Sequence, residues 1–200
     1  MMLIEQTVVP LSALPVQALK DHLRLGTGFA DDAMQDAMVE GHLRAGLTAI
    51  EGRIGKALIA RSFKLVLAHW RDRDGQGQAL PLAPVSAVTA VVLVDEGGIE
   101  TPVPPSRWRL VVDRHRPRLA PSGLALPLVP MDGRVEITFQ AGFGDWAAVP
   151  ADLQQAVLRL AGEYYERRHE GGAREGGLPL AVQQLIEPWR NVRVLGGGGR

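Results

Sequence analysis

The feature that most constrains the fold is a strand, a glycine pair and a long helix that follow one another within residues 134–170. Val135, Ile137 and Phe139 alternate with polar residues, the period-two pattern of a strand with one buried face. Glycines at both ends of 142–144 then interrupt the strand, because glycine adopts backbone angles that other residues resist. The apolar stripe predicted for the following helix comprises Leu153, Val157, Leu160, Ala161 and Tyr164.

Composition limits the class of protein. The 200 residues, 46% of them apolar, suit one domain or one core with an elaboration. The 22 basic and 22 acidic residues cancel, so no global charge favours nucleic acid or membrane. The absence of cysteine excludes disulfides, thiolate zinc sites and a cysteine nucleophile. We expect a soluble protein without a signal peptide or membrane span, since the apolar runs are too short for either.

Two helices are predicted before the β region, over residues 14–25 and from about residue 31 to Ile54. The second is rich in small side chains, which let helices approach each other closely. We expect its small-residue face to pack against the helix of residues 150–170. That predicted face consists of Met34, Ala37, Met38, Gly41, Ala45, Thr48 and Ile54.

Residues 58–140 form a proline-punctuated β region. Its predicted strands cover 58–70, 88–94, 107–112 and 134–140, and Asp95 to Gly98 supplies a hairpin turn. A short helix opening at Leu178 follows a glycine-rich linker.

The fold class predicted from these elements is α+β: a small helical bundle from both ends of the chain with an inserted antiparallel β region. The predicted domain ranges are 1–57 with 149–195 for the helical core, 58–148 for the β-rich insertion and 196–200 for a disordered tail.

Signals of catalysis are weak. Glu166 and His169 have the spacing found in di-iron carboxylate sites, but such sites need two copies and two further glutamates. The five histidines are scattered, and the glycines of 196–199 precede no helix that could cradle a phosphate. We predict no catalytic residues, no metal, no cofactor and no enzyme activity.

One charge cluster stands out within twelve residues, opposed only by Asp113. The favoured interpretation is a solvated hairpin, because charge runs usually face water. The alternative is a basic strand pair that faces DNA phosphates or an acidic partner. The cluster comprises Arg107, Arg109, Arg114, Arg116 and Arg118.

A family resemblance covers nearly the whole chain. The segments that carry it, in order, are AIEGRIGKAL (49–58), LPLAPVSAV (80–88), QAGFG (140–144), VPADLQQA (149–156), YERR (165–168) and the closing helix from Leu178 to Arg190. In this combination the chain resembles the head–tail connector (adaptor) proteins of long-tailed bacteriophages and of phage-derived gene transfer agents. The smallest members are almost wholly helical, so the β region resembles the longer subgroup.

The resemblance implies a homo-oligomeric ring, expected to be a dodecamer, that binds the portal protein and leaves an axial channel. DNA would make transient, non-specific contact in the channel, and the next neck or tail protein (stopper or terminator) would bind above. The location implied is the neck of a virion or phage-like particle assembled in the bacterial cytoplasm. We expect residues 178–195 to dock on the portal. The interface residues expected there are Leu178, Leu185, Trp189, Arg190 and Arg193.

Two alternatives remain open at this stage. The chain could form another ring of the neck or tail, or act as a small nucleic-acid-binding module through the cluster of Arg107 to Arg118. The sequence leaves open the ring number, whether the ring needs the portal, the tail-side partner, the role of the β region and the choice between phage and gene transfer agent.

Overall fold

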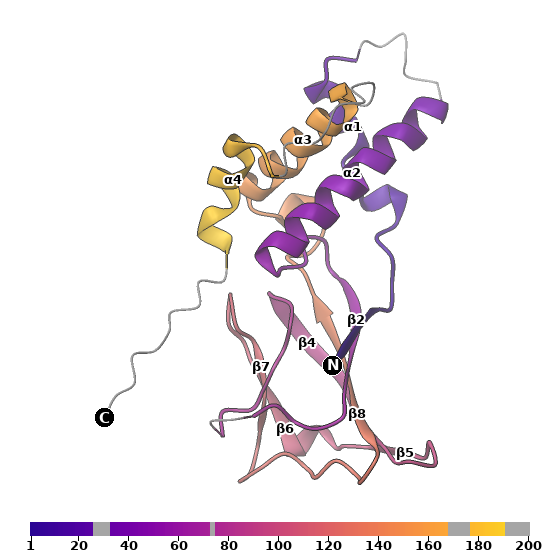
Figure 1. Ribbon diagram of the computed structural model, residues 1–200, viewed down its shortest axis with the longest axis vertical. Helices are drawn as coiled ribbons and strands as arrows, with labels where there is room; N and C mark the ends of the chain where they lie inside the picture. The colour runs from indigo at the N-terminus through magenta and orange to yellow at the C-terminus, as the bar shows by residue number, and fades with distance from the viewer. Residues whose placement is uncertain (26–32, 73–74, 168–176, 191–200) are drawn as a thin grey trace, which may run out of the picture. The chain divides into compact units, whose positions relative to one another are not determined.

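The computed structural model describes residues 1–25, 33–72, 75–167 and 177–190. The chain forms two compact units, each built from two separate segments. The β unit combines Met1–Pro15 with Lys56–Pro150, and the helical unit combines Val16–Gly55 with Ala151–Arg200 (Figure 1). The structure is therefore α+β, with antiparallel sheets, as the sequence predicts.

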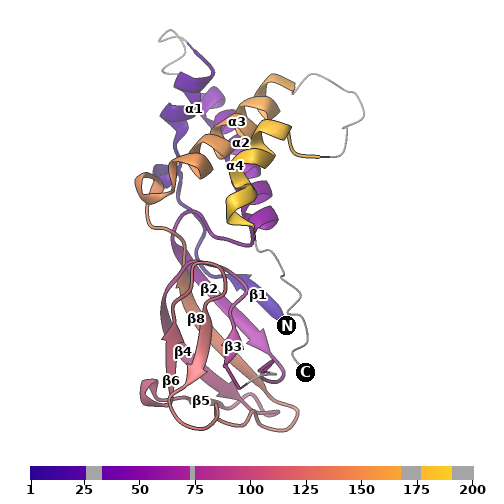
Figure 2. The same cartoon turned by 90° about the vertical axis from the view of Figure 1, so that its left-hand side faces the viewer.

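The β unit contains two antiparallel sheets (Figure 2). The larger sheet has the order β1-β2-β8-β4-β5, and the smaller has the order β3-β7-β6. The strands are β1 (Met2–Glu5), β2 (Arg61–Leu67), β3 (Gln78–Ala79), β4 (Val85–Val94), β5 (Glu100–Pro102), β6 (Trp108–Val111), β7 (Arg118–Pro121) and β8 (Arg134–Ala141). The 3-10 turns η1 (Leu11–Ala13), η3 (Pro105–Arg107) and η4 (Trp146–Ala148) complete the unit.

The core of the β unit lies between the two sheets. Along β2 and β8 the inward positions are opposite one another in register, with Phe63 facing Phe139 and Leu65 facing Ile137. The two phenylalanine rings stack with centroids 5.8 Å apart. Leu119 of β7 belongs to the same buried cluster, so the smaller sheet closes the core. The alternation predicted for residues 134–140 is confirmed, because β8 alternates buried with half-buried positions along most of its length.

The glycine pair after β8 is required by close backbone packing. Gly142 and Gly144 have φ of 130° and 132°, a region that side-chain-bearing residues rarely adopt. A Cβ at Gly142 would overlap the backbone of Ile59 and Ala60. Backbone hydrogen bonds join the elbow to the same neighbours, since the Ala60 N–H donates to the Gly144 carbonyl over 2.7 Å. The elbow is thus a structural joint of the β unit.

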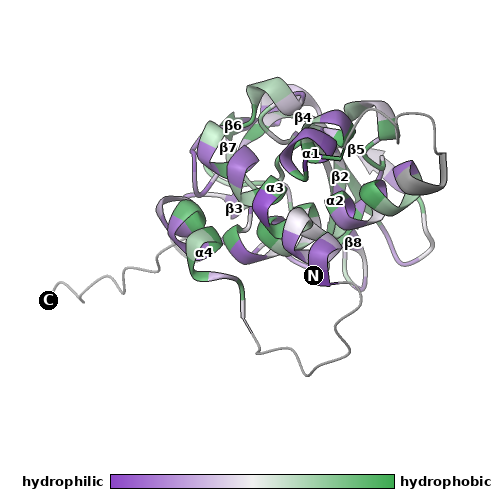
Figure 3. Cartoon of the chain, turned by 90° about the horizontal axis from the view of Figure 1, so that it is seen from above, coloured by the Kyte–Doolittle hydropathy of each residue, from purple (hydrophilic) through white to green (hydrophobic). Residues whose placement is uncertain are grey.

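The helical unit contains α1 (Val16–His22), α2 (Ala33–Ile54), α3 (Ala151–Glu166), α4 (Leu180–Ile186) and the 3-10 turn η6 (Glu187–Trp189). The helix α3 contacts each of the other three α-helices. Its predicted apolar stripe is confirmed for Leu153, Val157, Leu160 and Ala161, which are almost fully buried, whereas Tyr164 is half-buried. Figure 3 shows hydrophilic and hydrophobic segments on each of α2, α3 and α4, as expected for amphipathic helices.

The pairing of α2 with α3 is as predicted, but the predicted face of α2 is wrong for all its described members except Ile54. Ala37, Gly41, Ala45 and Thr48 are exposed, whereas the buried stripe consists of Val39, Leu43, Leu47, Ile50 and Ile54. Large aliphatic side chains remove more apolar area from water, so they decide which face turns inward. The close approach occurs instead at Gly46, where a Cβ would lie 3.4 Å from the Val157 carbonyl oxygen.

The unit boundaries differ from the predicted ranges at the N-terminus. Those ranges placed residues 1–57 with the helices, whereas Met1–Pro15 belongs to the β unit. The cause is β1, which pairs antiparallel with β2 so that Leu3 faces Leu65. Among the described residues, no helix is long and apolar enough to cross a membrane.

Candidate functional site

The basic cluster lies on the hairpin of β6 and β7. In the antiparallel register Arg109 faces Ala120 and Val111 faces Arg118, so these four side chains share one face of the hairpin. Trp108, Leu110 and Leu119 alternate with them and pack against the buried core. The fold therefore places the two strand arginines on the side of the hairpin that faces away from the core.

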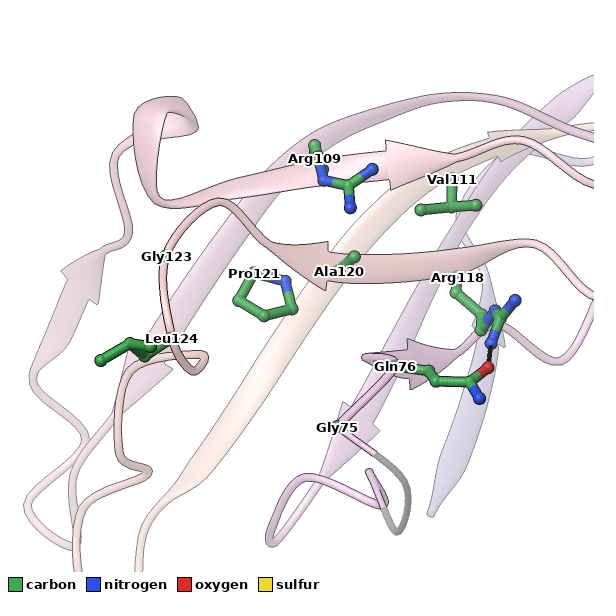
Figure 4. A pocket seen from close by; sticks show the side chains of 9 residues that line it. All are labelled: Gly75, Gln76, Arg109, Val111, Arg118, Ala120, Pro121, Gly123 and Leu124. Atoms are coloured by element: carbon green, nitrogen blue, oxygen red, sulfur yellow. Dashed lines mark hydrogen bonds between the residues drawn. The ribbon is translucent and has the colours of Figure 1, made fainter.

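These two arginines line an open hollow of about 380 Å³. Figure 4 shows Arg109 and Arg118 on neighbouring strands, with Gln76 opposite Arg118 and the loop of Gly123 and Leu124 at the other end. A guanidinium nitrogen of Arg118 donates to Oε1 of Gln76. Its Nε is buried without a hydrogen-bond partner among the described residues. The hollow thus combines two cations with the apolar side chains of Val111 and Ala120, which line it between them.

The turn between β6 and β7 is held by Asp113. Its Oδ1 accepts the backbone N–H of His115 over 2.7 Å and that of Arg116 over 2.6 Å. These two backbone hydrogen bonds hold the pKa of Asp113 below its usual value. Because the carboxylate spans the turn, Arg114 and Arg116 are displayed outward from a defined backbone.

A buried lysine ties this turn to the rest of the β unit. Lys56 is fully buried, and its Nζ donates to the Arg114 carbonyl oxygen over 2.6 Å and lies 3.3 Å from His115 Nδ1. Burial, reinforced by the charge of Arg114 and opposed by Asp113, lowers the pKa of Lys56. Burial and the charge of Lys56 likewise lower the pKa of His115. Lys56 is thus a positioning residue for the turn.

The predicted arginine cluster is therefore divided by the fold. Arg109 and Arg118 meet at the hollow, whereas Arg114 and Arg116 lie on the turn at one end of the hairpin. Arg107 ends the 3-10 turn before β6, at the opposite end from that turn. Sequence reasoning missed Lys56 and Gln76. Lys56 stands before the apolar run of residues 57–60, which was the only local signal of its burial.

The C-terminal segment supplies the second predicted surface. Leu178 and Leu185 are half-buried and Arg190 is exposed, while Arg193 lies outside the described residues. Trp189 is only 5% exposed, and its indole N–H donates to Asp152 Oδ2 over 2.6 Å. In the protomer this tryptophan holds the C-terminal segment against the first turn of α3. Its part in an interface stays a prediction.

The described residues contain no cluster of three or more histidine, cysteine, aspartate or glutamate side chains that could hold a metal ion. His169, half of the di-iron-like spacing, lies outside the described residues.

Comparison with known proteins identifies the class. A chain from the neck of an empty gene transfer agent (GTA) particle, computed with C6 symmetry, is 57% identical over 98% of this chain and 99% of that chain, with a TM-score of 0.88. A chain of a native GTA virion is 56% identical over 98% of this chain and 99% of that chain, with a TM-score of 0.85. A third, from the neck of a native particle computed with C12 symmetry, is 52% identical over 98% and 99%, with a TM-score of 0.83.

No protein-family model matches the sequence, and no curated protein matches it. The agreement in sequence and fold over nearly the full length defines a structural component of a phage-like particle, located in its neck. The chain belongs to the family of gene transfer agent neck proteins. The C6 and C12 symmetries of the related necks indicate a ring oligomer within a particle.

Proposed function

We propose that the chain is the head–tail connector (adaptor) subunit of a gene transfer agent or phage-like particle. Twelve copies form a ring between the portal and the tail and leave an axial channel for DNA. The observation that carries the proposal is the near-full-length similarity to chains of GTA necks. A ring of twelve has both the C6 and the C12 symmetry in which the related necks were computed, which supports this number.

The adaptor role within the neck is supported by the closing segment. The segment expected to dock on the portal is residues 178–195. In the protomer, the part of this segment up to Arg190 is a short helix fastened to α3 through Trp189, with Leu185 half-buried and Arg190 exposed. A preformed helix that keeps polar and apolar groups accessible suits docking into a groove of another protein.

The net charge supports the channel part of the proposal. A conduit for DNA must let the duplex pass, and each phosphate contact made by a cation resists movement. The equal numbers of basic and acidic residues give a formal net charge of zero. DNA would therefore touch the ring only transiently. The protein would serve as a structural subunit, without catalysis.

The test is reconstitution with the portal protein. Electron microscopy of the purified chain, alone and with portal, should show a twelve-fold ring seated on the portal. Removal of residues 191–200, and separately the exposed-site change Arg190→Glu, should weaken portal binding in a pull-down while α4 stays folded. If both variants bind the portal as strongly as the wild type, the segment does not dock on the portal.

A second candidate is another ring of the neck. It makes the opposite prediction in the same assay: the chain would bind a tail-tube or other neck protein and leave the portal unbound. Parallel reconstitutions with portal and with tail-tube protein separate the two functions.

A further inference from the structure

The hairpin between β4 and β5 carries an acidic tip with one apolar side chain. The turn is held at three points: Asp95 N–H donates to the Ile99 carbonyl, Gly98 N–H donates to the Asp95 carbonyl, and Ile99 N–H donates to Asp95 Oδ1 over 2.8 Å. Glu96 and Glu100, three residues before and one residue after Ile99, are exposed, and Ile99 is itself 67% exposed. Neither glutamate has an ion-pair partner among the described residues. The tip is therefore a hydrogen-bonded protrusion that carries an exposed apolar side chain close in sequence to two exposed carboxylates.

The β6–β7 face has the complementary character. Arg109 is exposed, and the half-buried Arg118 borders the same hollow. Val111 and Ala120 line the hollow between them, and Leu124 at its end is fully exposed. Two cations around an apolar floor match an aliphatic side chain flanked by carboxylates, in charge and in polarity.

The two surfaces lie on opposite sides of the β unit. Both Figure 1 and Figure 3 show β5 on one side and the β6–β7 hairpin on the other. A ring of identical subunits is joined by heterologous contacts, in which one patch of each subunit meets a different patch of the next. A pair of complementary patches on opposite sides of one unit satisfies this requirement.

We propose that the acidic tip of the β4–β5 hairpin docks on the β6–β7 face of a neighbouring copy of this chain. Ile99 enters the hollow, and Glu96 and Glu100 pair with Arg109 and Arg118 of the next subunit. The inference rests on the proposed ring and deepens it, because it assigns a role in subunit pairing to the β region.

The geometry favours a second copy over DNA at this face. A phosphate backbone offers anionic groups spaced along a strand, and it has no aliphatic group that would fill an apolar hollow. The arginines are also divided by the fold, with Arg107 and Arg114 at opposite ends of the hairpin.

Reciprocal charge reversal tests the contact. One variant carries Glu96→Arg and Glu100→Arg, and the other carries Arg109→Glu and Arg118→Glu. Each alone places like charges together, and we expect its self-association, followed by sedimentation velocity and native mass spectrometry, to weaken at least about tenfold. An equimolar mixture should restore rings in which the two variants alternate, since each tip then meets an opposite charge. Such rescue also shows that both variants are folded.

A second pair of variants leaves the partly buried Arg118 unchanged. Because Arg118 donates to Gln76, its replacement can disturb the hairpin. A mixture of two single variants, the exposed-site change Arg109→Glu and the change Glu96→Arg, tests the same contact.

Covalent capture gives an independent readout, because the chain contains no cysteine. With Ile99→Cys and Leu124→Cys in one chain, oxidation should produce a ladder of linked subunits. The matched control replaces Leu124→Cys by Val112→Cys, an exposed position on the turn of the same hairpin, and should give no ladder.

The outcomes separate the two proposals. If the wild-type chain forms no ring with or without portal, the proposed ring fails and the contact fails with it. If the ring forms and the reversed variants assemble equally well, only the contact is wrong. If the variant with Arg109→Glu and Arg118→Glu forms intact rings that no longer admit DNA, the β6–β7 face contacts DNA and not a second copy.

Discussion

Glu136 illustrates how single residues stabilise the outer face of the larger sheet. Its carboxylate accepts hydrogen bonds from Lys64 Nζ over 2.7 Å and from Arg134 Nε over 2.8 Å. The hydrogen bonds from Lys64 and then Arg134 lower the pKa of Glu136 below its ordinary 4.5. A carboxyl with a lowered folded-state pKa contributes stability above its unfolded pKa and loses it as pH falls through the folded value.

The change Glu136→Gln should therefore cost stability in a pH-dependent manner. We expect a loss of about 1–3 kcal/mol in the free energy of unfolding at pH 7, because two cations lose a charged acceptor. The difference from wild type should shrink as pH falls from 4.5 through the lowered folded-state pKa, because the folded wild-type carboxyl becomes protonated over that range. Urea unfolding at a series of pH values measures both. At concentrations where the chain is monomeric, the exposed-site change Glu96→Gln should show neither effect, and an equal loss at all pH values would contradict the account.

A second prediction for a single residue concerns the backbone at Gly142. Gly142→Ala should destabilise the β unit by at least about 2 kcal/mol, since the position combines a φ of 130° with overlap against Ile59 and Ala60. Gly98→Ala is the matched control, because Gly98 has a φ of 82° but no atom within 4 Å of an added Cβ. Its cost should be about 1 kcal/mol, from strain alone. Equal shifts in the urea midpoint would show that the close approach at Gly142 is unimportant.

At the scale of elements, α3 organises the helical unit. It contacts α1, α2 and α4, and its buried stripe is continuous from Leu153 to Ala161. The edge-to-face contact of His42 with Tyr165 adds to the α2–α3 packing, with ring centroids 5.8 Å apart. The C-terminal helix α4 is only seven residues long, too short to be stable by itself. Its order therefore depends on α3, and on the Trp189–Asp152 hydrogen bond in particular.

Trp189→Phe should loosen α4 selectively. The change keeps an aromatic ring but removes the indole N–H, which leaves Asp152 Oδ2 without this donor and costs about 1 kcal/mol. Hydrogen exchange should accelerate across residues 180–186 and stay unchanged in the middle of α3. Arg190→Ala is the control, because its ion pair with Glu187 is exposed and contributes little. Unchanged exchange in α4 of the Trp189 variant would show that apolar packing alone holds the helix.

At the scale of the whole molecule, charge balance is the property that bears most directly on function. The chain has a formal net charge of zero, and Arg109 and Arg118 lie on a different hairpin of the β unit from Glu96 and Glu100. Such a distribution favours contact between copies over attraction to DNA. It also supplies a measurement that separates a ring subunit from a nucleic-acid-binding module.

We expect the isolated chain to bind a 20-base-pair duplex more weakly than about 10⁻⁴ M at 0.15 M salt, the weak end of non-specific DNA binding. Fluorescence anisotropy at two salt concentrations tests this. A micromolar affinity that falls steeply with salt and disappears in Arg109→Glu would establish the nucleic-acid-binding alternative.

Features that depend on neighbours in sequence were predictable. The alternation along β8, the stripe of α3 and the turn from Asp95 to Gly98 all follow from side-chain periodicity or from the backbone freedom of glycine. The α+β class followed from their order along the chain. The family resemblance likewise rested on short segments whose order is visible without a structure.

Features that depend on distant partners were settled only by the tertiary structure. Periodicity suggested a face for α2, but the packing partner selected the aliphatic stripe around Leu43 and left Gly41 outside. The pairing of β1 with β2, the burial of Lys56 beneath the turn of Arg114, and the hydrogen bond of Trp189 to Asp152 each join residues far apart in sequence. Local sequence determines which element forms, whereas burial and pairing depend on which distant surface the fold brings to it.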